Sequence, residues 1–145
     1  MKKIALALGL LGFTVLANAA DPLNGTVWKT IDDKTKQPKA IVKFTEQKNG
    51  SLSASIQNVL TVGEENACKK CEGPYHKKSL KGLRIVQGLQ NAGGNSYENG
   101  TILDPQSGKT YKLKGQIVEG GKKLELRGFI GVSVLGRNQV WIRAN

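Results

Sequence analysis

The sequence contains little cysteine, histidine, aromatic residue or acid. Its 145 residues include two Cys, one His and 6% aromatic side chains, and 11 Asp and Glu stand against 22 Lys and Arg. With a single His, no Ser–His–Asp or Cys–His arrangement is spaced to predict a hydrolase. The formal charge of +11 argues against a neutral cytosolic enzyme and favours an acidic partner or surface. The length predicts one domain.

Long hydrophobic runs are absent except at the N-terminus. After a short basic start, the apolar run Ile4–Ala17 is shorter than the ~20 residues that a membrane span needs. The small residues Ala17 and Ala19 then occupy the two positions that a signal peptidase recognises before its cleavage site. We predict a secretory signal peptide, residues 1–19, cleaved after Ala19, with Ala20 as the alternative. No Cys lies near this site, so a lipid anchor is not expected.

The remaining chain, residues 20–145, is expected to reach the periplasm or the exterior of the cell. Loss of Lys2 and Lys3 with the leader lowers the formal charge from +11 to +9. A chain of this size buries roughly two-thirds of its unfolded surface, which suffices for one core. No further segment is apolar enough to cross a membrane. The sequence therefore predicts a small, basic, exported domain.

Helical periodicity is nearly absent from residues 20–145, and alternation of apolar and polar residues recurs between turn signals. This pattern predicts half-buried antiparallel strands. Glycine-rich turns separate eight candidate strands: Thr26–Ile31, Ala40–Glu46, Leu52–Val59, Leu83–Leu89, Tyr97–Leu103, Thr110–Val118, Lys123–Ile130 and Gln139–Arg143. The predicted fold class is all-β, a small antiparallel up-and-down barrel of about eight strands, because closure removes exposed sheet edges.

The turn at Gly120-Gly121 allows a register to be predicted. A two-residue loop pairs four sets of residues on one apolar face: Ile117 with Leu124, Gly115 with Leu126, Leu113 with Gly128 and Tyr111 with Ile130. The opposite face is polar and includes the like-charged pair of Lys114 and Arg127. One face is apolar and the other polar, so the register is well specified.

The registers of two further hairpins can be predicted in the same way from the lengths of their loops. A three-residue loop ending in a left-handed Gly50 pairs Phe44 with Ala54 and Val42 with Ile56, whereas a two-residue loop would mix the faces. A four-residue loop, Pro105–Gly108, pairs further inner residues: Ile102 with Tyr111, and Gly100 with Leu113. The three hairpins together define the expected inner face of the barrel.

The inner face supplies the candidate ligand-lining residues. These are Val42, Phe44, Ile56, Ile102, Tyr111, Leu113, Ile117, Leu124, Leu126 and Ile130. Gly100, Gly115 and Gly128 share this face, where they either let the strands bend sharply, which we favour, or leave room for a ligand. The alternative for the whole set is that these side chains simply fill the core. Glu98 would turn inward opposite Gly115 in this register, unless the strand begins after it.

The motif Cys68-Lys69-Lys70-Cys71 has several interpretations. In an exported protein, a structural disulfide is the default. A redox dithiol would need a helix N-terminus, and no such context is visible. A metal site could recruit His76 and Glu72, but the chain has no second Cys pair. Haem attachment would need His directly after Cys71, where Glu72 stands.

The basic residues form two groups. Lys69, Lys70, Lys77, Lys78 and Lys81 crowd the Cys motif, whereas Lys109, Lys112, Lys114, Lys122, Lys123 and Arg127 lie on or beside the last long hairpin. They could meet an anionic lipid surface or simply form a solvated face. Nucleic-acid binding is not expected, because aromatic residues are not interleaved with the Lys groups and Phe44 and Phe129 are assigned to the core.

Four stretches of sequence resemble a known bacterial family. They are Gly25–Trp28; Lys81–Ile85; Asn99–Pro105 with Gly108–Tyr111; and Leu126–Gly131 leading into Leu135-Gly136-Arg137-Asn138-Gln139-Val140-Trp141-Ile142-Arg143. Together they resemble the exported proteins grouped as domain-of-unknown-function family 2147 over essentially all of residues 20–145. The resemblance implies a lipocalin-like (calycin) barrel and no established enzyme activity, ligand, cofactor or catalytic residue.

Barrel closure would bring the first and last strands of such a fold together. Trp28 lies in the first strand and Arg143 in the last, so the guanidinium could stack on the indole, worth ~1 kcal/mol or more if desolvated. Trp141 shares a face with Arg143 by its spacing. The chain departs from the lipocalin pattern in having two residues between Gly25 and Trp28.

Three hypotheses for function follow. The leading one is a non-enzymatic protein that binds a small apolar or amphipathic ligand inside the barrel. The second is an envelope interaction module that uses its basic patches on anionic lipid or on a partner protein. The third is a redox protein that uses Cys68 and Cys71. No metal or cofactor is expected, and the sequence does not indicate an oligomeric state.

Overall fold

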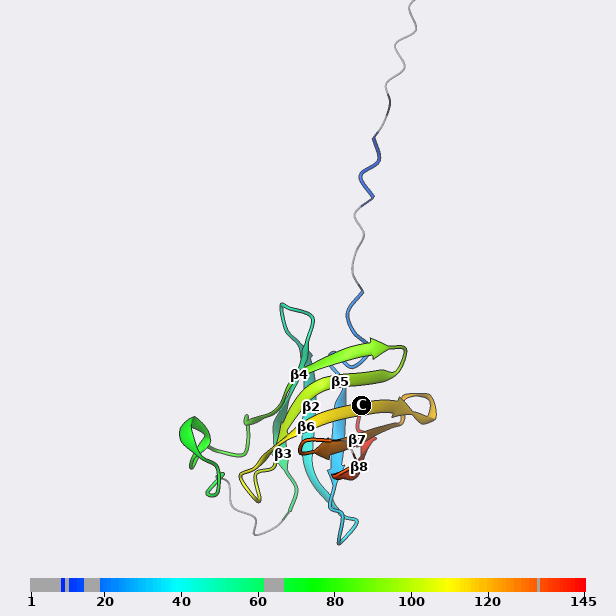
Figure 1. The fold of residues 1–145 in the computed structure, drawn as a ribbon. Helices are drawn as coiled ribbons and strands as arrows, with labels where there is room; N and C mark the ends of the chain where they lie inside the picture. Colours follow the sequence, from blue (N-terminus) through cyan, green and yellow to red (C-terminus); the bar gives the residue numbers. More distant parts are fainter. Residues whose placement is uncertain (1–8, 10, 15–18, 62–66, 133) are drawn as a thin grey trace, which may run out of the picture.

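The computed structural model describes residues 9, 11–14, 19–61, 67–132 and 134–145, and these contain one closed β-barrel (Figure 1). The antiparallel strands follow one another around the barrel in sequence order, and β8 closes it against β1. The strands are β1 (Val27–Ile31), β2 (Pro38–Glu46), β3 (Leu52–Val59), β4 (Arg84–Gly93), β5 (Ser96–Leu103), β6 (Thr110–Val118), β7 (Lys123–Phe129) and β8 (Gly136–Arg143). Short 3₁₀ turns occur at η1 (Gly73–Tyr75) and η2 (Glu119–Gly121). The predicted all-β barrel is confirmed.

The β6–β7 hairpin has the predicted register. Leu113 faces Gly128, Gly115 faces Leu126, and Ile117 faces Leu124. Gly120 and Gly121 have φ of 63° and 92°, the left-handed conformations of a type I′ turn. This turn matches the right-handed twist of the strands, so the Gly-Gly pair sets the register.

The other two predicted hairpins are also present. In β2–β3, Val42 faces Ile56 and Phe44 faces Ala54, and Gly50 (φ 82°) ends the three-residue loop. In β5–β6, the pairs are Ile102 with Tyr111 and Gly100 with Leu113. Turn chemistry thus determined the registers of three hairpins of the barrel.

Strand ends and one bulge differ from the prediction. β7 ends at Phe129, so Ile130 lies in the β7–β8 loop and is not a strand partner of Tyr111. Both readings of Glu98 were wrong, because β5 begins before it and yet Glu98 is exposed. A bulge between Tyr97 and Gly100 puts Tyr97, not Glu98, opposite Gly115. One extra residue in a strand turns the following side chains to the other face.

One end of the barrel is filled by large side chains. The aromatic residues Trp28, Phe44 and Tyr97 and the aliphatic residues Leu52, Leu89 and Leu124 are all at most 1% exposed. The segment before β1 covers this end, since Leu23 is fully buried and the Gly25 N–H donates to the Phe44 carbonyl at 3.0 Å. We refer to this end as the closed end.

A polar contact ties the covering segment to the barrel. The Tyr97 hydroxyl donates to Asp21 Oδ1 at 2.8 Å, and the Leu23 N–H donates to the same oxygen at 2.8 Å. Burial raises the pKa of Tyr97 far above its ordinary value of 10, and the hydrogen bond to the Asp21 carboxylate adds to this effect. Tyr97 is therefore neutral at pH 7.

The leader prediction is not tested by the fold. Residues 1–8, 10 and 15–18 lie outside the described residues. All strands and buried side chains of the described chain lie between Leu23 and Arg143, so residues 20–145 hold the complete barrel. No helix among the described residues is long and apolar enough to cross a membrane.

Candidate functional site

The end of the barrel opposite the closed end is hollow. It contains a cavity of about 1130 Å³, which opens between the β1–β2 end, the β3–β4 connection, the β5–β6 loop and the β7–β8 loop. Seven of the candidate lining residues surround it: Val42, Ile56, Ile102, Tyr111, Leu113, Leu126 and Ile130. Further apolar side chains from the same end include Ala40, Val59, Leu80 and Ile85. The alternation along the strands therefore produces an apolar chamber.

Three candidate lining residues lie elsewhere. Phe44 and Leu124 are fully buried and Ile117 is 8% exposed, and none of them borders the cavity. They pack in the closed end, because the end of β6 and the start of β7 meet there through the pair Ile117–Leu124. Alternation predicts which face a residue occupies, but not how deep along the barrel axis it sits.

Trp141 forms part of the cavity wall. Its side chain is 1% exposed, and its Nε1 donates to Gln139 Oε1 at 3.0 Å. Its ring centroid lies 6.3 Å from that of Phe44 in the closed end. The sequence assigned Trp141 only to barrel closure. Its spacing of two from Arg143 predicted only that these two residues share a face, and the lining role depends on how deep Trp141 sits along the barrel axis.

Trp28 and Arg143 meet where the barrel closes. Trp28 pairs with Arg143 across β1 and β8, and the guanidinium carbon lies 5.4 Å from the indole centroid. The Trp28 Nε1 donates to Thr26 Oγ1 at 2.8 Å, and this hydroxyl donates to the Leu23 carbonyl at 2.6 Å. The indole thus has its polar group satisfied while it seals the closed end.

The three inner glycines have different roles. A Cβ on Gly100 would lie 2.8 Å from Leu89 Cδ1, and a Cβ on Gly115 would lie 2.7 Å from Leu126 Cδ2, so leucine side chains occupy both positions. A Cβ on Gly128 would meet nothing closer than Tyr111 Cβ at 3.6 Å, and Gly128 borders the cavity. Gly128 therefore has room for a methyl group in ordinary van der Waals contact, whereas the other two allow close packing.

Charged side chains gather at the cavity opening. Among the described residues, four cations and one carboxylate line it: Lys39, Lys69, Lys70, Arg137 and Asp104. Lys69 and Lys70 belong to the basic group around the Cys motif, whereas Lys77, Lys78 and Lys81 are exposed and do not border the cavity. The cavity thus has an apolar interior and a polar, mainly cationic opening.

Two further carboxylates stand behind these cations. Asp32 Oδ2 lies 3.6 Å from Lys39 Nζ, and Asp33 pairs with Arg137. The Thr35 N–H donates to Asp32 Oδ1 at 2.7 Å, and this hydrogen bond is the main cause that lowers the pKa of Asp32 from 3.8 to about 2. Asp32 is therefore ionised at neutral pH, and its carboxylate pairs with Lys39 at the cavity opening.

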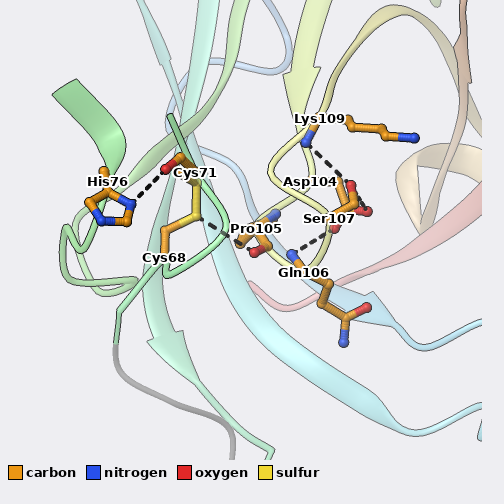
Figure 2. The surroundings of a disulfide bond; sticks show 8 residues. All are labelled: Cys68, Cys71, His76, Asp104, Pro105, Gln106, Ser107 and Lys109. Atoms are coloured by element: carbon orange, nitrogen blue, oxygen red, sulfur yellow. Dashed lines mark hydrogen bonds between the residues drawn. A yellow bond between two sulfur atoms is a disulfide. The ribbon is translucent and has the colours of Figure 1, made fainter. Parts of the chain in front are cut away.

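The Cys motif is docked beside the opening as a disulfide (Figure 2). Cys68 and Cys71 are joined, their Cα atoms are 5.4 Å apart, and they are 0% and 2% exposed. Cys68 Sγ lies 3.6 Å from the Pro105 carbonyl oxygen, and any side chain at Gly108 would collide with the Lys70 carbonyl. The motif therefore packs tightly against the β5–β6 loop.

The packing of the Cys motif can be compared with what a redox dithiol and a metal site would each require. Thiol exchange needs an accessible sulfur, and both sulfur-bearing residues are buried. The Nδ1 of His76 donates a hydrogen bond to the Cys71 carbonyl at 2.9 Å, so this nitrogen already has a hydrogen-bond partner. The described residues contain no group of three His, Cys, Asp or Glu side chains that could hold a metal ion.

The second basic group lies on the outer face of the barrel. Lys114 and Arg127 are opposite one another, as predicted, but their side chains diverge. Lys114 Nζ lies 5.9 Å from the centroid of Phe129, and Arg127 Nη1 donates to Asn138 Oδ1 at 2.8 Å. Phe129 is thus half-buried on the outer face, which corrects its assignment to the core. Lys112 is exposed on the same strand, β6.

The comparisons with known proteins agree with this architecture. Protein HP1028 of Helicobacter pylori, described as a member of the lipocalin family, shares the fold with a TM-score of 0.73 over 85% of this chain and 83% of its own. The two sequences are 23% identical. Comparison with curated proteins finds no significant match. Residues 26–143, which span the whole barrel, match a family of uncharacterized proteins conserved in bacteria, and the chain belongs to this family, DUF2147.

Proposed function

We propose that this protein is a non-enzymatic binding protein that holds one small apolar or amphipathic molecule inside its barrel. The cavity of about 1130 Å³ carries this proposal, because aliphatic and aromatic side chains line its depth. Ligand sites in proteins commonly occupy about 300–1,000 Å³ and are mainly apolar. A barrel whose inner side chains only filled a core would leave no chamber of this size.

The distribution of polarity favours an amphipathic ligand. Val42, Ile56 and Leu113 surround the interior, and the charged residues stand at the opening. A ligand with an apolar tail and a polar head would bury the tail and leave the head near Lys39 and Arg137. Asp104 is the one carboxylate among the described lining residues, and no His or Cys joins it there. This composition supports binding rather than acid–base chemistry.

The proposed setting is the periplasm. The predicted leader, residues 1–19, supports export, and a disulfide is typical of proteins in an oxidising compartment. An apolar molecule that crosses an aqueous compartment gains from a carrier that shields it from water. A small barrel with a cavity at one end suits that task.

Gly128 offers a direct test. In Gly128→Leu the side chain would enter the cavity, whereas Gly128→Ala adds one methyl group that makes only ordinary van der Waals contacts, the nearest 3.6 Å from Tyr111 Cβ. We expect the neutral probe N-phenyl-1-naphthylamine and the anionic probe 11-dansylaminoundecanoic acid to bind residues 20–145 with enhanced fluorescence. Gly128→Leu should weaken binding at least about tenfold, and Gly128→Ala should leave it nearly unchanged.

Two results would overturn the proposal. One is the absence of binding of either probe by the folded protein. The other is equal binding by Gly128→Leu and the unmodified chain, with both shown to be folded by circular dichroism. Organic extraction of protein purified from the exported fraction, followed by mass spectrometry, should release an apolar or amphipathic molecule in amounts comparable to the protein.

A further inference from the structure

The β7–β8 loop presents an aliphatic surface at the cavity opening. Ile130, Val132, Val134 and Leu135 are 60%, 59%, 78% and 71% exposed. Outside the predicted leader, the other large apolar side chains classed as exposed among the described residues are Leu60 at 39% and Val140 at 40%. The exposed aliphatic residues are thus concentrated in one loop, which we call the apolar tip.

The described residues of the apolar tip, which exclude residue 133, make one backbone contact across the loop. The Leu135 N–H donates to the Val132 carbonyl at 3.1 Å, and Gly131 adopts a left-handed φ of 71°. The four exposed aliphatic side chains of the tip face solvent at a cost in free energy that a covering partner would remove.

The apolar tip lies beside cations. Ile130, Val134 and Leu135 border the cavity opening together with Lys69, Lys70 and Arg137. Among the described residues, the four cations Lys39, Lys69, Lys70 and Arg137 stand at this opening against the three carboxylates of Asp32, Asp33 and Asp104. Residues 20–145 as a whole carry a formal charge of +9.

We propose that the apolar tip docks this protein on an anionic lipid bilayer, with the cavity opening turned toward the membrane. The aliphatic side chains enter the boundary between headgroups and acyl chains, and the cations at the opening face the anionic headgroups. The aliphatic side chains and the cations stand side by side at the opening, which matches the apolar and anionic layers of such a bilayer.

This arrangement goes beyond ligand binding and does not depend on it. A docked opening would let an apolar molecule pass between bilayer and cavity without crossing water. The tip could dock even if the cavity held nothing. Membrane binding and probe binding are therefore separate measurements, and the failure of one leaves the other interpretable.

Vesicle sedimentation tests the proposal on residues 20–145. We expect binding to phosphatidylcholine vesicles that contain phosphatidylglycerol, with weaker binding to pure phosphatidylcholine and a decrease as salt is raised. The double variant Val134→Ser, Leu135→Ser should bind at least about tenfold more weakly, since it loses apolar contact and no charge. Val140→Ser is the matched control, because Val140 is an exposed aliphatic residue on β8 outside the cavity lining.

Several results would overturn the proposal. These are the absence of binding to the anionic vesicles at low salt, equal binding to both kinds of vesicle, and a double variant that binds as well as the unmodified chain. A loss of binding in Val140→Ser equal to that of the double variant would also count against the tip. If gel filtration shows a dimer that the double variant dissociates, a second copy covers the tip instead.

Discussion

At the scale of single residues, Asp21 and Tyr97 connect the segment before β1 to the barrel. The Tyr97 side chain is 1% exposed, and its hydroxyl donates to a carboxylate that also accepts the Leu23 N–H. A buried hydroxyl without such a partner costs stability, so this contact both satisfies Tyr97 and holds Leu23 in the closed end. Residues 21–26, which precede β1, are therefore part of the fold.

Removal of the Tyr97 hydroxyl should lower stability and change its dependence on pH. We expect Tyr97→Phe to lower the unfolding free energy at pH 7 by about 1–3 kcal/mol, because Asp21 loses a buried partner. The folded-state pKa of Tyr97 is raised, so its contribution is complete below the unfolded value of about 10 and is lost as pH rises through the folded value. Urea unfolding between pH 7 and 11 should therefore show a steeper loss above pH 10 in the unmodified chain. Equal slopes in the two proteins would contradict this account.

At the scale of elements, the β3–β4 connection shows how a long loop is held in place. Ala67 pairs with Ser79, the Cys68 N–H donates to the Lys78 carbonyl at 2.8 Å, and the Lys77 N–H donates to the Cys68 carbonyl at 2.9 Å. The disulfide closes the short turn between these contacts and packs on the β5–β6 loop (Figure 2). The connection therefore forms one wall of the cavity opening.

Loss of the disulfide should loosen the connection and spare the barrel. We expect Cys68→Ser, Cys71→Ser to lower the unfolding free energy by no more than about 2 kcal/mol from chain entropy, because the closed loop is very short. Hydrogen exchange should become faster at the amides of Cys68 and Lys77, and it should stay slow in β2 and β6. Loss of protection throughout the barrel, or two free thiols in protein from the exported fraction, would contradict this interpretation.

At the scale of the whole molecule, the barrel is filled at one end and hollow at the other. Its two tryptophans report on these two regions, since Trp28 seals the closed end beneath Arg143 and Trp141 borders the cavity. Closure between β1 and β8 gives every strand two neighbours, so no sheet edge is left unpaired. A ligand would therefore occupy one end without rearrangement of the core.

The two tryptophans should respond differently to a ligand. We expect 11-dansylaminoundecanoic acid to quench Trp141 by energy transfer in Trp28→Phe, whereas the residual Trp28 emission in Trp141→Phe should change less because that indole lies farther from the cavity. Binding should also raise the unfolding free energy by about 2.7 kcal/mol at a ligand concentration 100 times the Kd. A thermal midpoint that does not change with saturating probe would contradict binding to the folded barrel.

The inner face and the hairpin registers could be predicted because they depend on neighbouring residues. The registers predicted from Gly120-Gly121 and from Gly50 are confirmed. Each turn type requires glycine in the left-handed conformation, and the turn type then determines which residues of the two strands pair. The predicted orientation of Glu98 was wrong because the local sequence pattern does not indicate the bulge before Gly100. Beside the bulge, the Leu89 side chain of β4 occupies the position that a Cβ on Gly100 would take, and such a contact between strands has no signal in the local pattern.

Local alternation and turn chemistry, together with the family motifs, determined from the sequence alone that this protein is a closed β-barrel with an apolar interior. Only the tertiary structure decided that the interior is hollow at one end, that Phe44, Ile117 and Leu124 lie below the cavity, and that Lys69 and Lys70 stand at its opening. The physical reason is that depth along the barrel axis and the docking of a long loop arise from closure and from contacts between distant segments, and neither leaves a periodic signal in the chain.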